Sequence, residues 1–482
     1  MRRTAPLLLC VLACASNDPN PPNGDGEDGG MRDTGATADA GPRDAGVPDG
    51  ASRDAGDRDA GAQNDRDAGA RDAGARDGGA PDAGPEPTER LDPVPGELTI
   101  VQLDLPAGVT VRLGEAAVLV GPAGSIALLD VGNSNHDDDV RAVVRDLNTR
   151  LLTPARGFAA RDALQIEWMI LTHVHGDHVG AFADLMSGAD ALEVRNGIVH
   201  RGFVDVGDAM NTNDYDDLCD RLTTDLAPLD RPLCVAATPA PCPYDAASGP
   251  HPAVGCPGLF AGDLATTDDD GDGLPAFIDL DGARITFAVV DGHTSDGATI
   301  QAVPAFGHDD SNEENARSLG GLVAYGAFRY WFGGDLTGSG DAGEPDVESA
   351  VASRALPAFA GALGVDIVHA HHHARRTSSN AAFIDASAPN DGLSRNVVAG
   401  INAAHLGSPH DDVVEHWTDA SRLGQGRFWV TTSAAGGATE ASHPALVVAD
   451  GDVLVQTLGQ GLGYRVQADG ANRRSARFDA VR

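Results

Sequence analysis

The sequence predicts an α/β fold that follows a long disordered N-terminal segment. Three observations support this prediction. From Leu98 onward, short apolar runs rich in β-branched residues alternate with helical segments, as in mixed α/β domains. One of these runs, residues 166–171, ends in a polar turn that leads into a helix. Residues 15–93, by contrast, have almost no large apolar side chains, so burial cannot offset the entropy of ordering them.

The first half of the folded part begins with three apolar runs that predict strands. Two of them are joined by Gly-Pro-Ala-Gly, a strong turn signal. A helix, a further strand and a second helix follow. In chain order the predicted elements are strands 98–105, 117–120 and 126–129, helix 138–152, strand 166–171 and helix 179–186.

The second half repeats the alternation of strand and helix after a long irregular stretch. Its last three apolar runs are expected to complete a second sheet. The predicted elements are strands 284–290, 299–303, 318–326 and 328–336, helix 344–361, and strands 365–370, 428–431, 446–448 and 453–455.

The balance of charge limits the classes of partner. The chain has 482 residues and a formal net charge of −38 at pH 7, and all its basic side chains are arginines. A chain this acidic repels extended nucleic acid and anionic membranes unless it has a local basic patch. No internal run reaches the roughly 20 apolar residues that a membrane span needs. We therefore expect a small-molecule or nucleotide substrate.

Residues 1–14 indicate export. Two arginines, a short apolar stretch and Ala13 before Cys14 are typical of a secretory signal peptide. The segment from Val11 to Cys14 resembles a bacterial lipobox, although Leu12 stands where a smaller residue is commoner. This resemblance implies cleavage before Cys14 and a lipid anchor at the cell envelope. Ordinary secretion with cleavage nearby is the alternative.

The low-complexity segment at residues 15–93 predicts a tether. Its unit Ala-Arg-Asp-Ala-Gly recurs, most clearly over residues 67–78. As a flexible coil the tether has an end-to-end distance of roughly 50 Å, enough to hold a folded domain away from a membrane surface. We place that domain at residues 94–470, with a Cys-rich and Asp-rich insertion at 205–282 and a tail at 471–482.

The insertion carries a cluster of four cysteines. In an exported protein an even, clustered set predicts two disulfides, whose pairing the sequence leaves open. A Cys₄ zinc site is the alternative, but the usual C-x₂-C pairs are absent. The residues are Cys219, Cys234, Cys242 and Cys256.

An acidic stretch at the end of the insertion is a candidate calcium site. Alternate aspartates with glycines in the turn offer the hard oxygen ligands that Ca²⁺ requires. The stretch resembles one thrombospondin type-3 calcium repeat, but departs from it at Ala276, where that repeat has Asp. The candidate ligands are Asp268, Asp270, Asp272 and Asp279. A solvated acidic loop is the alternative.

The most informative stretch is residues 172–178, at a junction of strand and helix. It places His173, His175 and His178 with Asp177 on one tight turn. Imidazole and carboxylate suit Zn²⁺, and the same set can hold Mn²⁺ or Fe. A polar loop with chance histidines is the alternative, but the whole chain has only 16 histidines. The sequence therefore predicts a metal centre.

The spacing H-x-H-x-D-H resembles the signature of the metallo-β-lactamase superfamily. The resemblance implies an αββα sandwich, in which two mixed sheets lie between outer helices and two divalent metals bind at one edge. It implies that His173 and His175 bind one metal, and that Asp177 and His178 bind the second. It leaves the substrate open, because one fold hosts many chemistries.

Two further aspartates are carried over from the same resemblance. Asp130 ends a strand and precedes a glycine, the position from which the family supports the metal loop through hydrogen bonds. Asp335 follows two glycines at the end of another strand, and it resembles the aspartate that bridges the two metals. Either Asp335 or Asp177 is a candidate to accept the proton of the attacking water.

Histidines after the bridging aspartate complete the expected ligand set. The pair His372 and His373 supplies the last ligand, and the sequence does not choose between them. The superfamily often adds a histidine between the first motif and the bridging aspartate. His308 is our candidate, with His200 and His293 as alternatives.

Three later motifs resemble the metallo-β-lactamase domain of ComEC-type DNA-internalisation proteins. They are N-x-x-S-L at 315–319, G-D-L at 334–336, and H-H followed by T-S-S at 377–379. The chain departs from that family at residues 374–375, where Ala-Arg replaces Gly-Ser, and at 407–410, where G-H-P-H has lost its first histidine. The resemblance covers about residues 98–460 apart from the insertion.

These features lead us to expect an exported metal-dependent hydrolase that acts on a phosphodiester. A hydrolase of lactones, β-lactams or other esters is the second hypothesis, and a non-catalytic surface protein with a structural metal site is the third. A basic rim around the metals would favour phosphodiesters. A closed apolar pocket would favour small esters.

Overall fold

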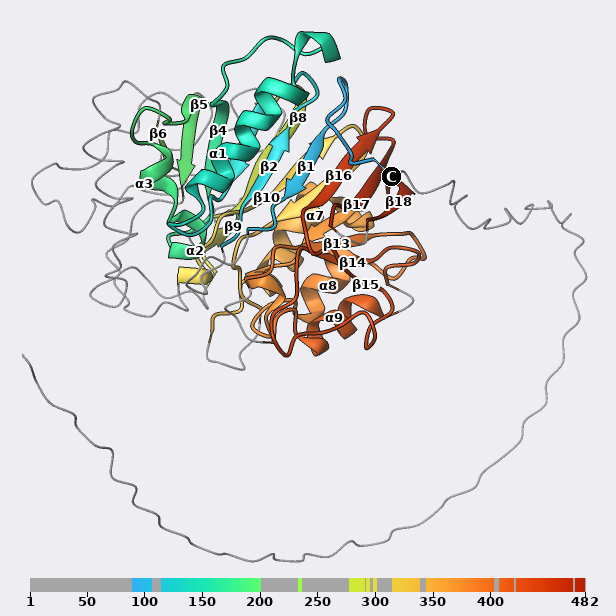
Figure 1. Ribbon diagram of the computed structural model, residues 1–482. Helices are drawn as coiled ribbons and strands as arrows, with labels where there is room; N and C mark the ends of the chain where they lie inside the picture. Colours follow the sequence, from blue (N-terminus) through green and yellow to red (C-terminus); the bar gives the residue numbers. More distant parts are fainter. Residues whose placement is uncertain are drawn as a thin grey trace, which may run out of the picture. The chain divides into compact units, whose positions relative to one another are not determined.

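A computed structural model shows how these elements are arranged (Figure 1). All described residues lie within Asp77–Arg482. The structure describes residues 89–105, 114–200, 233–235 (backbone alone), 277–290, 292–294, 298–300, 314–338, 344–402, 407–419, 422–470 and 473–481.

Several predicted features lie outside these residues. They are the signal segment, the tether up to residue 88, the side chains of all the predicted disulfides, His308, and three of the four candidate calcium ligands, Asp268, Asp270 and Asp272. Among the described residues, no helix is both long and apolar enough to cross a membrane.

The first sheet contains nine of the described strands. Its order is β18-β17-β16-β1-β2-β3-β4-β5-β6, with antiparallel pairing from β18 to β3 and parallel pairing from β3 to β6. The bounds are β1 (Thr99–Gln102), β2 (Ala117–Val120), β3 (Ile126–Leu129), β4 (Gln165–Leu171), β5 (Glu193–His200), β6 (Leu233–Val235), β16 (Val453–Leu458), β17 (Gly463–Ala468) and β18 (Arg474–Asp479).

The second sheet is also mixed. Its order is β15-β14-β13-β12-β11-β10-β8-β7, and β9 pairs with β8. The strands from β11 to β15 run parallel, whereas β7, β8, β10 and β11 pair antiparallel. The bounds are β7 (Phe277–Leu280), β8 (Ala283–Val290), β9 (His293–Thr294), β10 (Gly320–Tyr325), β11 (Phe328–Phe332), β12 (Ile367–His369), β13 (Asn396–Ala399), β14 (Phe428–Val430) and β15 (Leu446–Val448).

Helices cover the outer face of each sheet. Those on the first sheet are α1 (Asp137–Asp146), which continues into a π-helical turn, α2 (Gly176–Val179) and α3 (Phe182–Leu185). Those on the second sheet are α6 (Glu348–Ala350), which continues through a π-helical turn into α7 (Leu356–Phe359), α8 (Ala381–Ser387) and α9 (Asp411–Thr418).

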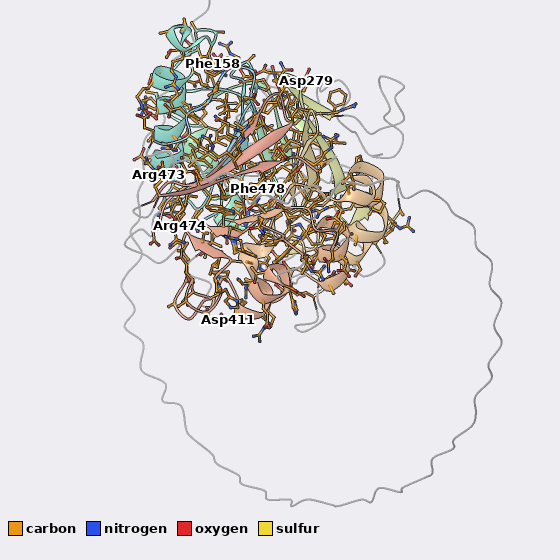
Figure 2. The ribbon with its side chains drawn as sticks, turned by 90° about the vertical axis from the view of Figure 1, so that its right-hand side faces the viewer. Phe158, Asp279, Asp411, Arg473, Arg474 and Phe478 are labelled. Carbon is orange, nitrogen blue, oxygen red and sulfur yellow. The ribbon has the colours of Figure 1, made fainter. Side chains whose placement is uncertain are left out.

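Apolar side chains form three buried layers. Along β2, Val118 and Val120 pack with α1 on the outer face, whereas Leu119 packs between the two sheets. In the second sheet Tyr330 points between the sheets, and Trp331 packs against the outer helices. Figure 2 draws these side chains as sticks on the ribbon. The predicted αββα sandwich is confirmed, because helices cover the outer face of each sheet and strands such as β2 and β11 alternate between two cores.

Two details differ from the sequence prediction. The run at 453–455 was expected in the second sheet, but β16 lies in the first, where Val455 pairs with Ile100 of β1. Residues 471–482 were expected to be a tail, but they contain β18, the edge strand beside β17. The first error arises because an apolar run predicts a strand but not its partner, which lies far away in the sequence. The second arises because β18 has only one large apolar residue, Phe478, so no apolar pattern indicates a strand there.

The insertion predicted at 205–282 also contributes to both sheets. β6 pairs with β5 in the first sheet, and β7 pairs with β8 in the second. The predicted helix at 179–186 is instead divided into α2 and α3. The break falls at Gly180, where a Cβ would lie 2.6 Å from the backbone nitrogen of Ser134.

Candidate metal centre

The candidate centre lies where strands of both sheets end. β3 and β4 run parallel, as do β11 and β12, so the carboxyl ends of each pair meet at one edge. These four ends lead directly into the chemically important side chains. β3 is followed by Asp130, β4 by His173, β11 by Asp335, and β12 by His371, His372 and His373.

Asp335 is the common neighbour of four imidazoles. Its Oδ1 lies 3.2 Å from Nε2 of His178. Its Oδ2 lies 3.7 Å from Nε2 of His173 and 3.8 Å from Nε2 of both His372 and His373. The carboxylate is buried. A carboxylate enclosed by imidazole nitrogens in this way can bridge two cations.

The two glycines before Asp335 permit this approach. Gly334 has a φ of +50°, which favours glycine. A Cβ on Gly334 would lie 2.6 Å from Oγ1 of Thr172, and a Cβ on Gly333 would meet the ring of His371. The glycines therefore let the β11 turn pack directly against the His-rich turns.

The candidate ligand atoms form two groups that share Asp335. One group is His173, His175 and Asp335, and the other is Glu115, His178, Asp335 and His373. Within each group the ligand atoms lie within 4.8 Å of one another. Asp177 adjoins the second group, because its Oδ2 lies 3.3 Å from Nε2 of His373.

The residues present fit divalent metals. Nε2 of His175, Nε2 of His178 and Oδ1 of Asp335 are buried and take no hydrogen bond within the described part of the chain, although the last two lie 3.2 Å apart. Buried polar atoms without a hydrogen bond are costly, and here they converge on one place. Imidazole and carboxylate are also the donors that Zn²⁺ and other first-row metals prefer.

Comparison with known families agrees with this geometry. Residues 111–393, more than half of the chain, match the family model described as the metallo-beta-lactamase superfamily. The chain belongs to the metallo-β-lactamase superfamily. No curated protein matches it. A solved structure from Cronobacter sakazakii, described as a metallo-beta-lactamase HARLDQ motif mutant, is 15% identical over 53% of this chain and 70% of its own, with a TM-score of 0.25.

Asp130 holds the metal-binding turn of this superfamily member in place. Its Oδ1 accepts the backbone N–H of Thr172 at 2.7 Å, and its Oδ2 lies 2.7 Å from Oγ1 of Thr172. The same Oδ2 lies 2.9 Å from Nδ1 of His178. A proton on Nδ1 leaves Nε2 of His178 to face Asp335 as a ligand atom.

Glu115 is a member of the centre that the sequence prediction missed. It is buried, its Oε2 lies 3.1 Å from Nδ1 of His373, and its Oε1 is in close contact with Nε2 of His369. Its backbone is also fixed, because its N–H donates to the carbonyl of Asp177 at 2.8 Å. The sequence signal was weak: a lone glutamate directly before an apolar strand.

The geometry distinguishes His373 from His372. Nδ1 of His373 lies 3.0 Å from the carbonyl of Gly400, so its Nε2 faces the carboxylates of Asp177 and Asp335. Nε2 of His372 is equally far from Asp335, at 3.8 Å, but it also lies 3.1 Å from an Arg375 nitrogen and belongs to neither ligand group. His373 is therefore the candidate ligand of the pair, whereas His372 contacts the cationic side chain of Arg375.

An unusual backbone produces this divergence. His372, His373 and Ala374 have successive φ values of +50°, +53° and +56°. Such left-handed residues are uncommon outside glycine and cluster at functional sites. In this turn the two adjacent imidazoles take different partners at Nδ1: Oγ1 of Thr377 for His372 and the carbonyl of Gly400 for His373.

Burial and charge act against each other in the pKa values of the centre. Burial alone would raise the pKa of Asp335, but the imidazoles of His178 and His373 hold it well below its usual range. Burial would lower the pKa of His373, but Asp335, Asp177 and Glu115 raise it to about 10. Burial, together with the charge of His178, holds the pKa of His173 well below its usual value.

The remaining candidate ligands among the described residues lie away from this centre. Asp279, the only candidate calcium ligand that is described, lies on β7, and its Oδ1 accepts the backbone N–H of Gly282 at 2.6 Å. It therefore closes the turn to β8. The alternatives His200 and His293 lie on β5 and β9, outside both ligand groups.

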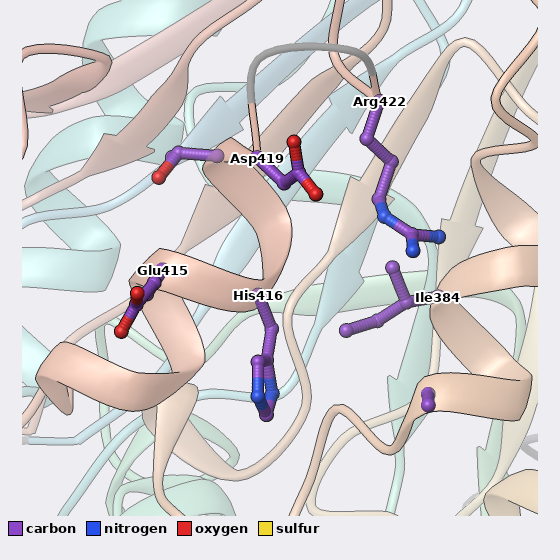
Figure 3. A pocket seen from close by; sticks show the side chains of 7 residues that line it. Ile384, Glu415, His416, Asp419 and Arg422 are labelled. Carbon is purple, nitrogen blue, oxygen red and sulfur yellow. The ribbon is translucent and has the colours of Figure 1, made fainter. Parts of the chain in front are cut away.

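A separate pocket of about 580 Å³ lies between α8 and α9 (Figure 3). Its walls are mixed: Glu415, His416, Asp419 and Arg422 are polar, and Ala381 and Ile384 are apolar. It contains none of the residues of the metal centre, so its volume gives no information about the substrate there.

Proposed function

We propose that the chain is an exported metal-dependent hydrolase that uses a dinuclear centre to cleave phosphodiesters. The observation that carries the proposal is Asp335, whose two oxygens are shared by two groups of buried ligand atoms. In such a centre, bound divalent metals lower the pKa of water and neutralise charge that develops on the substrate oxygen.

Neighbouring residues hold the imidazole rings of the candidate ligands in fixed orientations. Asp130 fixes the ring of His178, and Glu115 with the carbonyl of Gly400 fixes that of His373. Rings held in one tautomer and one orientation bind metals more tightly.

Asp177 fits the role of proton acceptor better than Asp335. The side chain of Asp177 is 17% exposed, whereas that of Asp335 is 3% exposed and enclosed by imidazoles. Nδ2 of Asn402 donates to Oδ2 of Asp177 at 2.8 Å and so aims the carboxylate. Asp177 can accept a proton from the attacking water and pass it to solvent.

An arginine beside the centre supports a phosphodiester rather than a neutral ester. Arg375 is half-buried and approaches His372, which lies 3.8 Å from Asp335. A guanidinium matches the oxygens of a phosphate group. The resemblance to ComEC-type domains and the expected export point to small nucleotides or phosphorylated compounds outside the cytoplasm.

Hydrolysis of bis-p-nitrophenyl phosphate by the full chain tests the proposal. We expect turnover that requires added Zn²⁺ or Mn²⁺ and that His175→Ala abolishes. His416→Ala is the matched control, because His416 is an exposed histidine on α9 and should leave turnover unchanged. Two metals bound without any turnover would refute the phosphodiester assignment and favour lactones or esters.

A further inference from the structure

Arg375 stands out among the arginines near the centre. It is half-buried, and it forms no ion pair with a carboxylate of the described residues. Its neighbour Arg376 is exposed and pairs with Asp412 at 2.8 Å. Partial burial of a cation without a counter-ion is unfavourable, which indicates that an anion completes the site.

His372 holds Arg375 in position. A guanidinium can only donate, so Nε2 of His372 must accept from the Arg375 nitrogen at 3.1 Å. Nδ1 of His372 then carries the proton, and it lies 2.6 Å from Oγ1 of Thr377. His372 is thus fixed at both ring nitrogens.

Asn315 adds a second donor at the same point. It is buried, and its Nδ2 lies 3.4 Å from Nε2 of His372. Asn315 and Arg375 therefore both contact Nε2 of His372, and this nitrogen is 3.8 Å from Oδ2 of Asp335. The side chains of Arg375 and Asn315 thus both approach His372, whose ring adjoins the carboxylate of Asp335.

We propose that Arg375 and Asn315 form an anion subsite that binds the non-bridging oxygens of a phosphoryl group, and that His372 is the positioning residue of this subsite rather than a metal ligand. The inference rests on the proposed phosphodiesterase function. It supplies the local positive charge that an anionic substrate needs to approach a chain with a net charge of −38. The planar fork of arginine can make two parallel hydrogen bonds to phosphate.

The test compares two adjacent arginines in the metal-loaded full chain. Binding of inorganic phosphate is measured by calorimetry for wild type, Arg375→Gln and Arg376→Gln. We expect Arg375→Gln to weaken binding by about tenfold to a hundredfold, the effect of losing a charge-assisted hydrogen bond. Arg376→Gln should change it less than about twofold, because exposed ion pairs contribute little.

Hydrolysis of two substrates separates this subsite from the proposed function. Arg375→Gln should lower kcat/KM for bis-p-nitrophenyl phosphate but not for uncharged p-nitrophenyl acetate, with metal content unchanged. Phosphate binding that depends on Arg375 in a chain without phosphodiesterase activity would support the subsite and refute the function. Turnover or phosphate binding that is equal in the two variants would refute the subsite, as would a wild type that binds no phosphate.

Discussion

Nδ1 of His371 lies 2.7 Å from a carboxylate oxygen of Glu348, and both side chains are fully buried. Nε1 of Trp331 donates to the other nitrogen of the ring at 2.8 Å, so Nδ1 must carry the proton that Glu348 accepts. Glu348 also accepts the backbone N–H groups of Ser379 and Asn380, at 2.8 and 2.7 Å. One buried glutamate thus fixes both ends of the loop that carries His372 and His373.

Replacing Glu348 with alanine should destabilise the fold and disturb the metal centre. The change leaves His371 and two backbone N–H groups buried without an acceptor, so we expect a loss of about 3 kcal/mol in the free energy of unfolding. Chemical denaturation measures it. Glu415→Ala, which removes an exposed glutamate on α9, is the control. Equal stability of the two variants would contradict the role of Glu348.

Replacing Glu115 with glutamine should weaken metal binding while the fold is retained. Glutamine keeps the shape of the side chain but loses the charge that orients His373, so we expect affinity for one of two metals to fall by about tenfold to a hundredfold. Titration against a chelator, with metal content as the readout, measures the change. Glu193→Gln on β5 is the control. If Glu115→Gln bound two metals as tightly as wild type, Glu115 would not orient a ligand.

The residues that could be predicted from the sequence are those whose signal is local. His173 to His178 lie on one turn, and Asp335 follows two glycines at a strand end, so a short window contains the whole pattern. The αββα architecture was implied by the family resemblance that this motif carries, whereas the apolar runs alone predicted only a mixed α/β fold.

What the sequence did not reveal depends on contacts between distant segments. Glu115 gains its role only from His369 and His373, more than 250 residues later. Which of His372 and His373 is the candidate ligand depends on a left-handed turn, and this turn cannot be predicted from two adjacent histidines. The pairing of β16 with β1 has the same origin.

Alanine substitutions at the two adjacent histidines should have different effects. His373→Ala removes a residue of the second ligand group, so we expect one metal to be lost from the chain. His372→Ala should retain both metals but weaken phosphate binding, because it frees Arg375. Metal analysis after dialysis measures the first effect, and calorimetry the second. Loss of metal from His372→Ala but not from His373→Ala would reverse the assignment.

Asp366 should make stability depend on pH. Burial raises its pKa from 3.8 to about 7, although it accepts the backbone N–H groups of Val481 and Arg329 at 2.6 and 2.7 Å. Between these pH values the folded chain keeps a proton that the unfolded chain has lost. The resulting stabilisation is full below about pH 4 and disappears as the pH rises through about 7.

Asp366→Asn removes this titration and so isolates its contribution. The unfolding free energy of wild type relative to Asp366→Asn should fall by up to about 4 kcal/mol between pH 4 and pH 8, because each pKa unit is about 1.36 kcal/mol. Urea denaturation at a series of pH values measures the difference. Asp479→Asn, which removes an exposed carboxylate on β18, is the control. A relative stability that rose with pH would mean that the N–H groups of Val481 and Arg329 outweigh burial and keep Asp366 ionised in the folded chain.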